Sequence, residues 1–252
     1  MAAQENQSVG TTPLSSFLDV PAESNFPIQN LPYGVFTPPS CSTKPRVGVA
    51  IGEQILDLSV LAEEGLFDGS FDASCFSRST LNDFMAMGKQ AWSSARATIQ
   101  HLLSAETATL RDDAALRARA LHPALEATMH LPASIGDFTD FYASREHATN
   151  VGTMFRGKGN ALQPNWSHLP VGYHGRASSV VVSGHDVVRP SGQIQVDPSD
   201  PRKGSRLGPC EKLDFELEVA FFVGPASRMG QPVDINHAEA HIFGMVLMND
   251  WS

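Results

Sequence analysis

The chain has 252 residues, of which 42% are hydrophobic and 18% are charged, and its formal net charge is −9. A chain of this length and composition buries a sizeable core and forms one large domain or two modest ones. The negative charge and the lack of a run rich in lysine and arginine argue against a nucleic-acid-binding protein. No segment has the pattern of a signal peptide or an apolar run long enough to span a bilayer, so we expect a cytosolic protein.

The first half of the sequence predicts a small α+β unit. Residues 1–16 are small and polar, and we expect them to be disordered. Residues 46–59, RVGVAIGEQILDLS, have two apolar runs joined around Gly52 and predict a β-hairpin. From residue 81 to residue 120 the apolar spacing becomes helical. We therefore expect an N-terminal domain over residues 17–130.

The sequence from residue 131 onward predicts a second domain rich in strands. Residues 178–190 predict a hairpin, residues 235–243 a short helical segment, and the stretches LDFELEVAFFVG and GMVLMND two strands. The sequence stops at NDWS, with no turn or cap after the second of these strands. We therefore expect residues 131–252 to be the front part of a domain whose C-terminal part is missing.

The three cysteines predict neither a disulfide framework nor a zinc site. Cys41, Cys75 and Cys210 are odd in number, far apart, and without the C-x-x-C spacing of metal sites. We expect reduced thiols with a mainly structural role.

The stretch LDFELEVAFF places Asp214, Glu216 and Glu218 at every second position. In a strand these acids would line one face about 7 Å apart, and the usual interpretation is a solvated face opposite a buried one. However, the same face continues into Ala220 and Phe222, which have buried character. Since like charges at that spacing repel by about 2 kcal/mol per pair at an effective dielectric near 20, a bound cation is the alternative.

A metal site is the more specific of these two hypotheses. Glu216 and Glu218, at positions i and i+2, would direct two hard oxygen ligands to one point. Asp140 and Asp250 are candidates for the remaining ligands, because each is an acid beside apolar residues. Asp214 begins the strand, and we expect it to be exposed to solvent.

A positively charged segment precedes this strand. Between residues 141 and 180 four cationic side chains stand against one carboxylate, which gives a local formal charge of +3. The cations are Arg145, Arg156, Lys158 and Arg176, and the carboxylate is Glu146. Such a segment in an acidic chain suits a small anionic substrate better than nucleic acid.

The residues ASREHATNVGTMF within this segment predict a helix capped by Ser144. His147 would then lie in the first turn, where the helix dipole disfavours the imidazolium and favours a neutral base. Simpler interpretations remain for each residue: a structural histidine, a surface ion pair for Arg156, and core or interface aromatic rings for Tyr142 and Tyr173.

Taken together, these segments resemble the fumarylacetoacetase family. The resemblance is carried by DFTDFYASREHATNVGTMFRGKGNALQPNWSHLPVGYHGRASSVVVSG, LDFELEVAFFVG and HIFGMVLMNDWS, and further upstream by FPIQNLPYGVF and RVGVAIGEQILDLS. It covers the chain from about residue 20 to its end, and motifs of this length are far more specific than a short pattern. The family implies an SH3-like N-terminal domain followed by a β-roll catalytic domain, here incomplete, in a β-rich α+β homodimer.

The resemblance also assigns roles by position. It implies that a divalent metal, calcium or magnesium, is held by Asp140, Glu216, Glu218 and Asp250. It implies a catalytic base at His147 and substrate-binding roles for Tyr142, Arg156 and Tyr173.

The reaction that the resemblance implies is hydrolysis of a carbon–carbon bond in 4-fumarylacetoacetate, which gives fumarate and acetoacetate in the last step of tyrosine and phenylalanine breakdown. His147 would take a proton from water, and the metal would stabilise the negative charge that develops. We expect the chain by itself to be inactive, because family members continue beyond NDWS.

Two other functions are compatible with the sequence. One is a metal-binding or interaction module without catalysis. The other is a related chemistry such as acylpyruvate hydrolysis, decarboxylation or hydration. The N-terminal domain argues against the second, because relatives with those activities generally resemble the catalytic domain alone.

Overall fold

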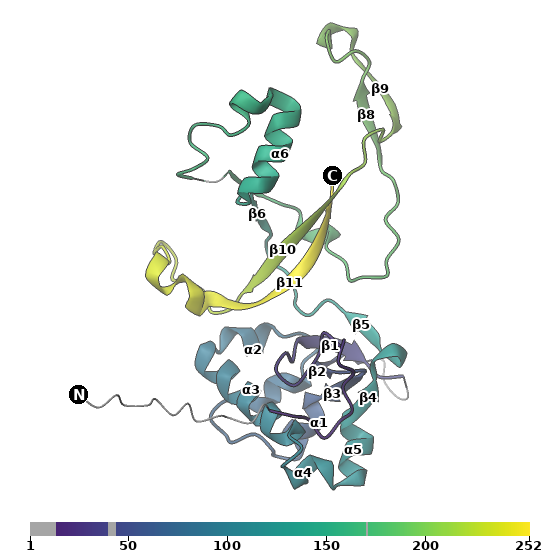
Figure 1. Ribbon diagram of the computed structural model, residues 1–252, viewed down its shortest axis with the longest axis vertical. Helices are drawn as coiled ribbons and strands as arrows, with labels where there is room; N and C mark the ends of the chain where they lie inside the picture. The colour runs from purple at the N-terminus through teal and green to yellow at the C-terminus, as the bar shows by residue number, and fades with distance from the viewer. Residues whose placement is uncertain (1–13, 40–43, 170) are drawn as a thin grey trace, which may run out of the picture. The chain divides into compact units, whose positions relative to one another are not determined.

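The computed structural model describes residues 14–39, 44–169 and 171–252 (Figure 1). Most of the segment predicted to be disordered, residues 1–13, and also Cys41 lie outside the described residues. The described chain contains helices and strands in a mixed, strand-rich arrangement, as the sequence predicts. It divides into two compact units, one formed by residues 1–133 with 184–252 and the other by residues 134–183.

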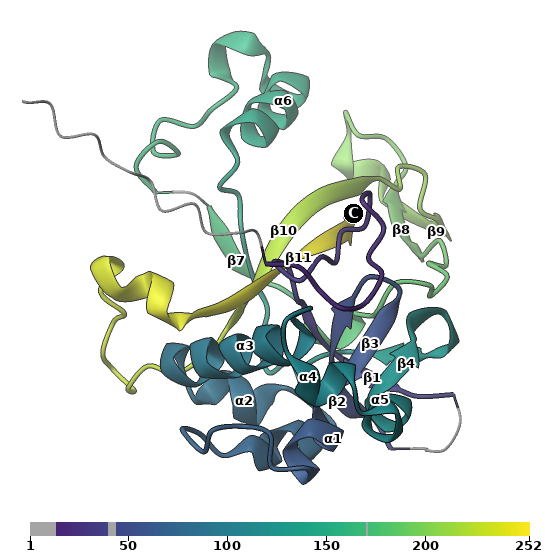
Figure 2. The same ribbon diagram turned by 60° about the horizontal axis from the view of Figure 1, so that its bottom comes forward.

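The first 133 residues are built around a five-stranded sheet with the order β4-β3-β2-β1-β5, in which all neighbouring strands are antiparallel. Its strands are β1 (Tyr33–Thr37), β2 (Arg46–Ile51), β3 (Gln54–Asp57), β4 (Leu121–Pro123) and β5 (Thr128–His130). The helices are α1 (Leu58–Glu63), α2 (Asn82–Ala86), α3 (Lys89–Leu103), α4 (Ala108–Arg111) and α5 (Ala114–Ala120), with short 3-10 turns at Ala73–Ser77 and Ala124–Glu126. Figures 1 and 2 show these helices gathered around the sheet.

The hairpin predicted over residues 46–59 is confirmed as β2 and β3. Gly52 occupies the turn with φ of +54°, a conformation that is costly for residues with a side chain. The helical segments predicted between residues 81 and 120 are confirmed as α2 to α5. In α3 the buried residues include Ala91, Trp92, Ala95 and Ile99, whose spacing places them on one face of the helix.

The hydrophobic core of the described residues lies almost entirely in this first part of the chain. Its largest fully buried side chains include Phe36, Phe76, Phe84, Leu56 and Leu103. Side chains of this size each remove a large apolar area from water, so this part of the chain supplies most of the hydrophobic stabilisation.

The same unit contains four later strands, all in antiparallel pairs: β8 (Ser191–Gln195) with β9 (Ser205–Pro209), and β10 (Phe215–Val223) with β11 (Ile242–Trp251). Short 3-10 segments span Pro201–Lys203 and Ile235–His241, and the second confirms the helical segment predicted there. The strands predicted from LDFELEVAFFVG and GMVLMND are therefore confirmed.

The hairpin predicted for residues 178–190 is wrong. The structure has a 3-10 turn at Ala177–Ser179 and no strand from residue 180 to residue 190. Val181, Val187 and Val188 are 55%, 47% and 83% exposed. The valines therefore satisfy strand propensity locally but have no packed surface against which a strand pair would be stable.

The second unit, residues 134–183, is small. It consists of the strand pair β6 (Thr139–Phe141) and β7 (Gly172–His174), the helix α6 (Arg145–Arg156), and 3-10 turns at Lys158–Asn160 and Ala177–Ser179. No helix in the described part of the chain combines the length and the apolar character that a membrane crossing requires.

One buried ion pair fixes the junction between β3 and α1. Asp57 is fully buried, caps α1 by accepting from the backbone N–H of Ser59 at 2.9 Å, and accepts from Nη1 of Arg46 at 2.8 Å. Removal of the Asp57 carboxylate would uncap α1. It would also leave the partly buried guanidinium of Arg46 without this partner.

We predict that Asp57→Ala lowers the free energy of unfolding by about 3 to 5 kcal/mol, the usual cost of breaking a buried pair. Asp83→Ala is the matched control, because Asp83 forms an exposed pair with Arg78 at 3.2 Å, and we expect a change below about 1 kcal/mol. Urea unfolding followed by circular dichroism measures both, and equal losses in the two variants would contradict the prediction.

Two buried groups, the Cys75 thiol and the Tyr33 hydroxyl, make the stability of the fold depend on pH. Burial, with a smaller contribution from Asp72 and Asp83, raises the pKa of the Cys75 thiol to about 12. Burial likewise raises the pKa of the Tyr33 hydroxyl. The folded protein therefore retains protons that the unfolded chain releases from about pH 9 upward. The contribution of these groups to the free energy of unfolding is complete below that pH and declines above it.

We predict that the urea concentration at the midpoint of unfolding, measured from pH 7 to pH 10, falls above pH 9. The fall should be less steep in Cys75→Ala, and a constant midpoint would refute the prediction.

Candidate functional site

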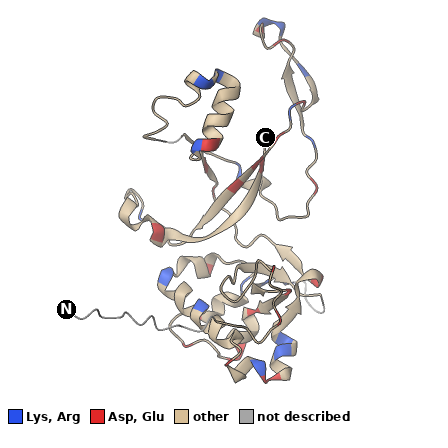
Figure 3. Cartoon of the chain, viewed as in Figure 1, with Lys and Arg blue, Asp and Glu red and all other residues tan. Residues whose placement is uncertain are grey.

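The pairing of β10 with β11 brings together three predicted metal ligands, Glu216, Glu218 and Asp250. In the antiparallel register Glu216 lies opposite Asp250, and Glu218 lies opposite Met248. Because residues directly opposite share a face, all three acids project from the same side of this two-stranded ribbon. Figure 3 shows the acidic positions as red bands on the ribbon.

The two faces of the ribbon differ in exposure in an unusual way. Its apolar face is the open one: Leu217 is 79% exposed, Val219 64%, and Leu247 on the partner strand 78%. Glu216 and Glu218 project from the other face and are half-buried, because exposed and half-buried residues alternate along β10. The usual interpretation of alternation, with the apolar face on a core and the acids in water, is therefore wrong here.

The carboxylates of Glu218 and Asp250 are close enough to share a cation. One oxygen of each lies within 4.8 Å of the other, and both residues are half-buried. Two oxygens bound to the same calcium at about 2.4 Å can be at most about 4.8 Å apart, so the spacing fits a calcium ion. Carboxylate oxygens are also the hard ligands that calcium and magnesium prefer.

Asp214 lies outside this group, as predicted. It is exposed and precedes β10, where its backbone N–H donates to the carbonyl of Ser252 at 2.7 Å and its own carboxylate accepts from the N–H of Phe215 at 2.9 Å. Its role in the structure is to close the end of the ribbon.

The second unit contains the other predicted site residues. In the pair of β6 and β7, Asp140 lies opposite Tyr173, and the tyrosine hydroxyl donates to Oδ2 of Asp140 at 2.7 Å. The tyrosine side chain is 56% exposed. The structure thus pairs a predicted metal ligand with a predicted substrate ligand.

Helix α6 begins as the sequence predicts. Ser144 is the N-cap, and its side chain accepts from the backbone N–H of His147 at 3.2 Å. The His147 ring stands at 80° to the ring of Tyr142, with 5.3 Å between the centroids. The backbone carbonyl of Tyr142 accepts from the indole N–H of Trp166 at 2.8 Å. The cap and the ring contact therefore hold the imidazole at a defined helix start.

Arg156 occupies the last turn of α6 and fastens the loop that follows. Its Nε donates to the carbonyl of Asn160 at 3.1 Å, and its Nη2 donates to the carbonyl of Ala161 at 2.7 Å. The loop lies directly against Gly152, where an added Cβ would be 1.9 Å from the Ala161 oxygen. The arginine is exposed, so it can still present guanidinium N–H groups to an anion.

Three residues that position the site were not singled out from the sequence. Asp137 lies 3.1 Å from Nε2 of His174, next to the pair of Asp140 and Tyr173. Gly152 and Trp166 act through packing and a backbone hydrogen bond. The repeated DFTDFY pattern could have drawn attention to Asp137, whereas the other two depend on loop contacts that no local pattern reveals.

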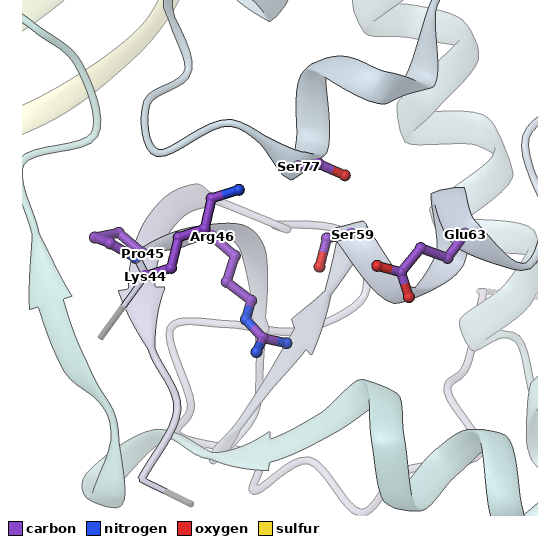
Figure 4. Close-up of a pocket in the computed structure, with 6 residues that line it drawn as sticks. All are labelled: Lys44, Pro45, Arg46, Ser59, Glu63 and Ser77. Atoms are coloured by element: carbon purple, nitrogen blue, oxygen red, sulfur yellow. The ribbon is translucent and has the colours of Figure 1, made fainter. Parts of the chain in front are cut away.

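Two cavities of the described residues are lined by residues other than those of the predicted site. One of about 170 Å³ is lined by Lys44, Pro45, Arg46, Ser59, Glu63 and Ser77 (Figure 4). A larger one, of about 410 Å³, lies along residues 14–29. In the first cavity Arg46 is already bound to the buried Asp57 at 2.8 Å, which leaves a polar hollow of mixed charge.

Comparison with known proteins places both halves of the chain. The family model described as Fumarylacetoacetase N-terminal matches residues 29–132, and that described as Fumarylacetoacetate (FAA) hydrolase C-terminal matches residues 137–252. The chain is 61% identical to fumarylacetoacetase of Mus musculus over 240 residues and 58% identical to that of Homo sapiens over 240 residues. It is 54% identical to that of Arabidopsis thaliana over 243 residues.

These alignments cover 94%, 94% and 95% of this chain and 56% of each relative, so the chain spans about half the length of the curated relatives that it matches. The fold and the matched segments define a mixed helix-and-strand protein that matches the N-terminal and C-terminal models of one family. The chain belongs to the fumarylacetoacetase family, and the resemblance seen in the sequence is confirmed.

We predict that Gly152→Ala destabilises the second unit, since the methyl group has no room beside the Ala161 carbonyl. Overpacking of this kind costs about 1 to 3 kcal/mol. Gly159→Ala is the control, because nothing lies within 4 Å of a Cβ at that position. Proteolysis or hydrogen exchange of residues 134–183 reports local opening, and similar protection in the two variants would count against the prediction.

Proposed function

We propose that the protein hydrolyses the carbon–carbon bond of 4-fumarylacetoacetate to give fumarate and acetoacetate, the last step of tyrosine and phenylalanine breakdown. The relatives that it resembles carry the name fumarylacetoacetase. The observation that carries the proposal is the half-buried pair of Glu218 and Asp250, whose carboxylate oxygens lie within 4.8 Å of each other.

The proposed metal site consists of Asp140, Glu216, Glu218 and Asp250, with calcium or magnesium as the ion. Support comes from the shared face of the three acids on β10 and β11 and from the hard-oxygen chemistry of the whole set. When bound, the cation would polarise the diketone oxygens and stabilise the negative charge that develops during cleavage.

His147 is the proposed general base. It takes a proton from a water molecule, and the oxygen of that water attacks the carbonyl carbon of the fumaroyl group. The bond from this carbon to the acetoacetate unit then breaks, and its electron pair stays with acetoacetate as an enolate, which gains a proton. The Ser144 cap supports this role because it fixes the start of the helix that carries the imidazole.

Arg156, Tyr142 and Tyr173 are the proposed substrate-binding residues. The substrate carries a carboxylate at each end, and guanidinium and phenol N–H and O–H groups are the donors that hold such oxygens. The local charge of +3 around these residues would attract a dianion to an otherwise acidic protein. Without substrate the Tyr173 hydroxyl donates its single proton to Asp140 at 2.7 Å, and it would exchange this partner for a substrate oxygen.

The architecture and setting of the protein form part of the same proposal. We infer an SH3-like N-terminal domain over residues 17–130 and the front part of a β-roll catalytic domain over residues 131–252. The five-stranded antiparallel sheet and the ribbon of β10 and β11 are compatible with this division. A homodimer in the cytosol is the proposed assembly and location.

The test separates binding from catalysis. We expect residues 1–252 to bind Ca²⁺ or Mg²⁺ in a calorimetric titration, and Glu218→Gln to weaken that binding by roughly 10- to 100-fold. The chain alone is expected to turn over little substrate, because the apolar face of its ribbon is open. Turnover is therefore measured in a chain completed with the remaining length of the Mus musculus relative.

In that completed chain His147→Ala should lower the rate of diketone cleavage by about 10²- to 10⁴-fold, since a general base is lost. The exposed His168 provides the control, and His168→Ala should retain the rate. Metal binding without cleavage of fumarylacetoacetate would refute the enzymatic proposal, and faster cleavage of acylpyruvates would assign a different substrate.

A further inference from the structure

The ladder between β10 and β11 contains one irregularity, at the end away from the acids. Phe222 lies opposite Gly244, but the next residue, Val223, lies opposite Ile242, so Phe243 is left without a partner in the ladder. A bulge of this kind bends the strand and redirects the side chain of the extra residue.

The redirected side chain packs on aromatic residues of the first part of the chain. The ring of Phe243 lies 5.1 Å from Trp92, 5.8 Å from Phe84 and 5.9 Å from Tyr33, measured between ring centroids. Met245, two residues further along the strand, is 67% exposed. Without the bulge, alternation would place Phe243 on that same open face, so the irregularity is what turns the ring onto the core.

Gly224 brings the other strand to the same place. An added Cβ there would lie 2.5 Å from Cζ2 of Trp92 and 2.9 Å from the carbonyl oxygen of Met85. Its backbone N–H donates to the carbonyl of His241 at 2.7 Å, which closes the ribbon just beyond the bulge. Both strands are therefore seated on α2 and α3 at this end.

The packing of Phe243 and Gly224 on α2 and α3 controls which side chains meet at the acidic end of the ribbon. A slip of one residue in the pairing would turn every side chain of β11 to the opposite face and take Asp250 away from Glu218. Two strands by themselves are only marginally stable in water, and the apolar face of this ribbon is open, as Leu217 and Leu247 show. The register therefore depends on contacts at the seated end.

We propose that Phe243, together with Gly224, is a positioning residue: it seats the β10–β11 bulge on Trp92 and thereby holds Asp250 beside Glu218 in the register that a cation requires. The consequence for metal binding rests on the proposed function, whereas the consequence for register does not. The N-terminal part of the chain would thus act on the acidic pair through the ribbon, without a residue of its own at the pair.

A disulfide measures the register directly. Leu217 and Asn249 lie opposite each other on the open face, and opposite residues of antiparallel strands are about 4.5 to 5.5 Å apart, within the range of a disulfide. The double variant Leu217→Cys with Asn249→Cys should crosslink almost completely, as mapped by peptide mass spectrometry. Adding Phe243→Ala should lower the yield at least several-fold, whereas adding Met245→Ala should leave it unchanged. An undiminished yield with Phe243→Ala would overturn the proposal.

Gly224→Ala is a second variant, in case loss of the ring impairs folding as judged by circular dichroism. Its methyl group meets Trp92 while every apolar side chain is kept, and it should also lower crosslinking. Full crosslinking in this folded variant would overturn the proposal as well.

Calcium and magnesium titrations complete the test. Phe243→Ala should weaken binding by roughly 10- to 100-fold, as loss of an outer-shell partner does, and the Leu217–Asn249 disulfide should restore it. Failure of the disulfide to restore binding would overturn the action through register. If the parent chain binds neither ion while the crosslinking results hold, the metal proposal fails and the positioning role of Phe243 stands.

Discussion

The antiparallel register of β10 on β11 is the constraint on which the proposed site depends. Side chains along a strand alternate with a period of two, so the pairing that sets Glu216 opposite Asp250 also brings Glu218 to the same face. Carboxylates at such spacing repel each other, and the ribbon offers no apolar packing on its open face to offset that cost. In this arrangement a bound cation would stabilise the register as well as polarise the oxygens of a substrate.

The distribution of burial explains how a ribbon of this kind is held. Among the described residues, the buried hydrophobic side chains outside residues 28–133 are Ala148 and Ala161. Stability is thus concentrated in the N-terminal part, and Phe222 and Phe243 are the ribbon residues that pack against its core cluster. A division of this type lets one region supply the free energy of folding while another keeps charged, exposed surfaces for chemistry.

Features governed by neighbours in sequence were predictable, and features governed by distant pairing were not. The hairpin around Gly52 and the Ser144 cap follow from local turn and capping chemistry. The hairpin expected at residues 178–190 failed because strand propensity needs a surface to pack on. The approach of Asp250 to Glu218 spans more than thirty residues; the apolar flanks of Asp250 made it a candidate ligand, and only the family resemblance assigned it to the same site as Glu218. The bulge at Phe243 gave no signal in the alternation at all.

The charge pattern has a physical logic when it is considered with these contacts. The chain as a whole is at −9, yet residues 141–180 are locally at +3. A dicarboxylate would be repelled by the net charge at long range, but salt screens that repulsion beyond about 8 to 10 Å. At short range the exposed guanidinium of Arg156, which the Ala161 carbonyl already holds in place, would dominate at the proposed site. A donor that is fixed before a ligand arrives loses little entropy on binding it, so this prior hydrogen bond would favour affinity for an anion.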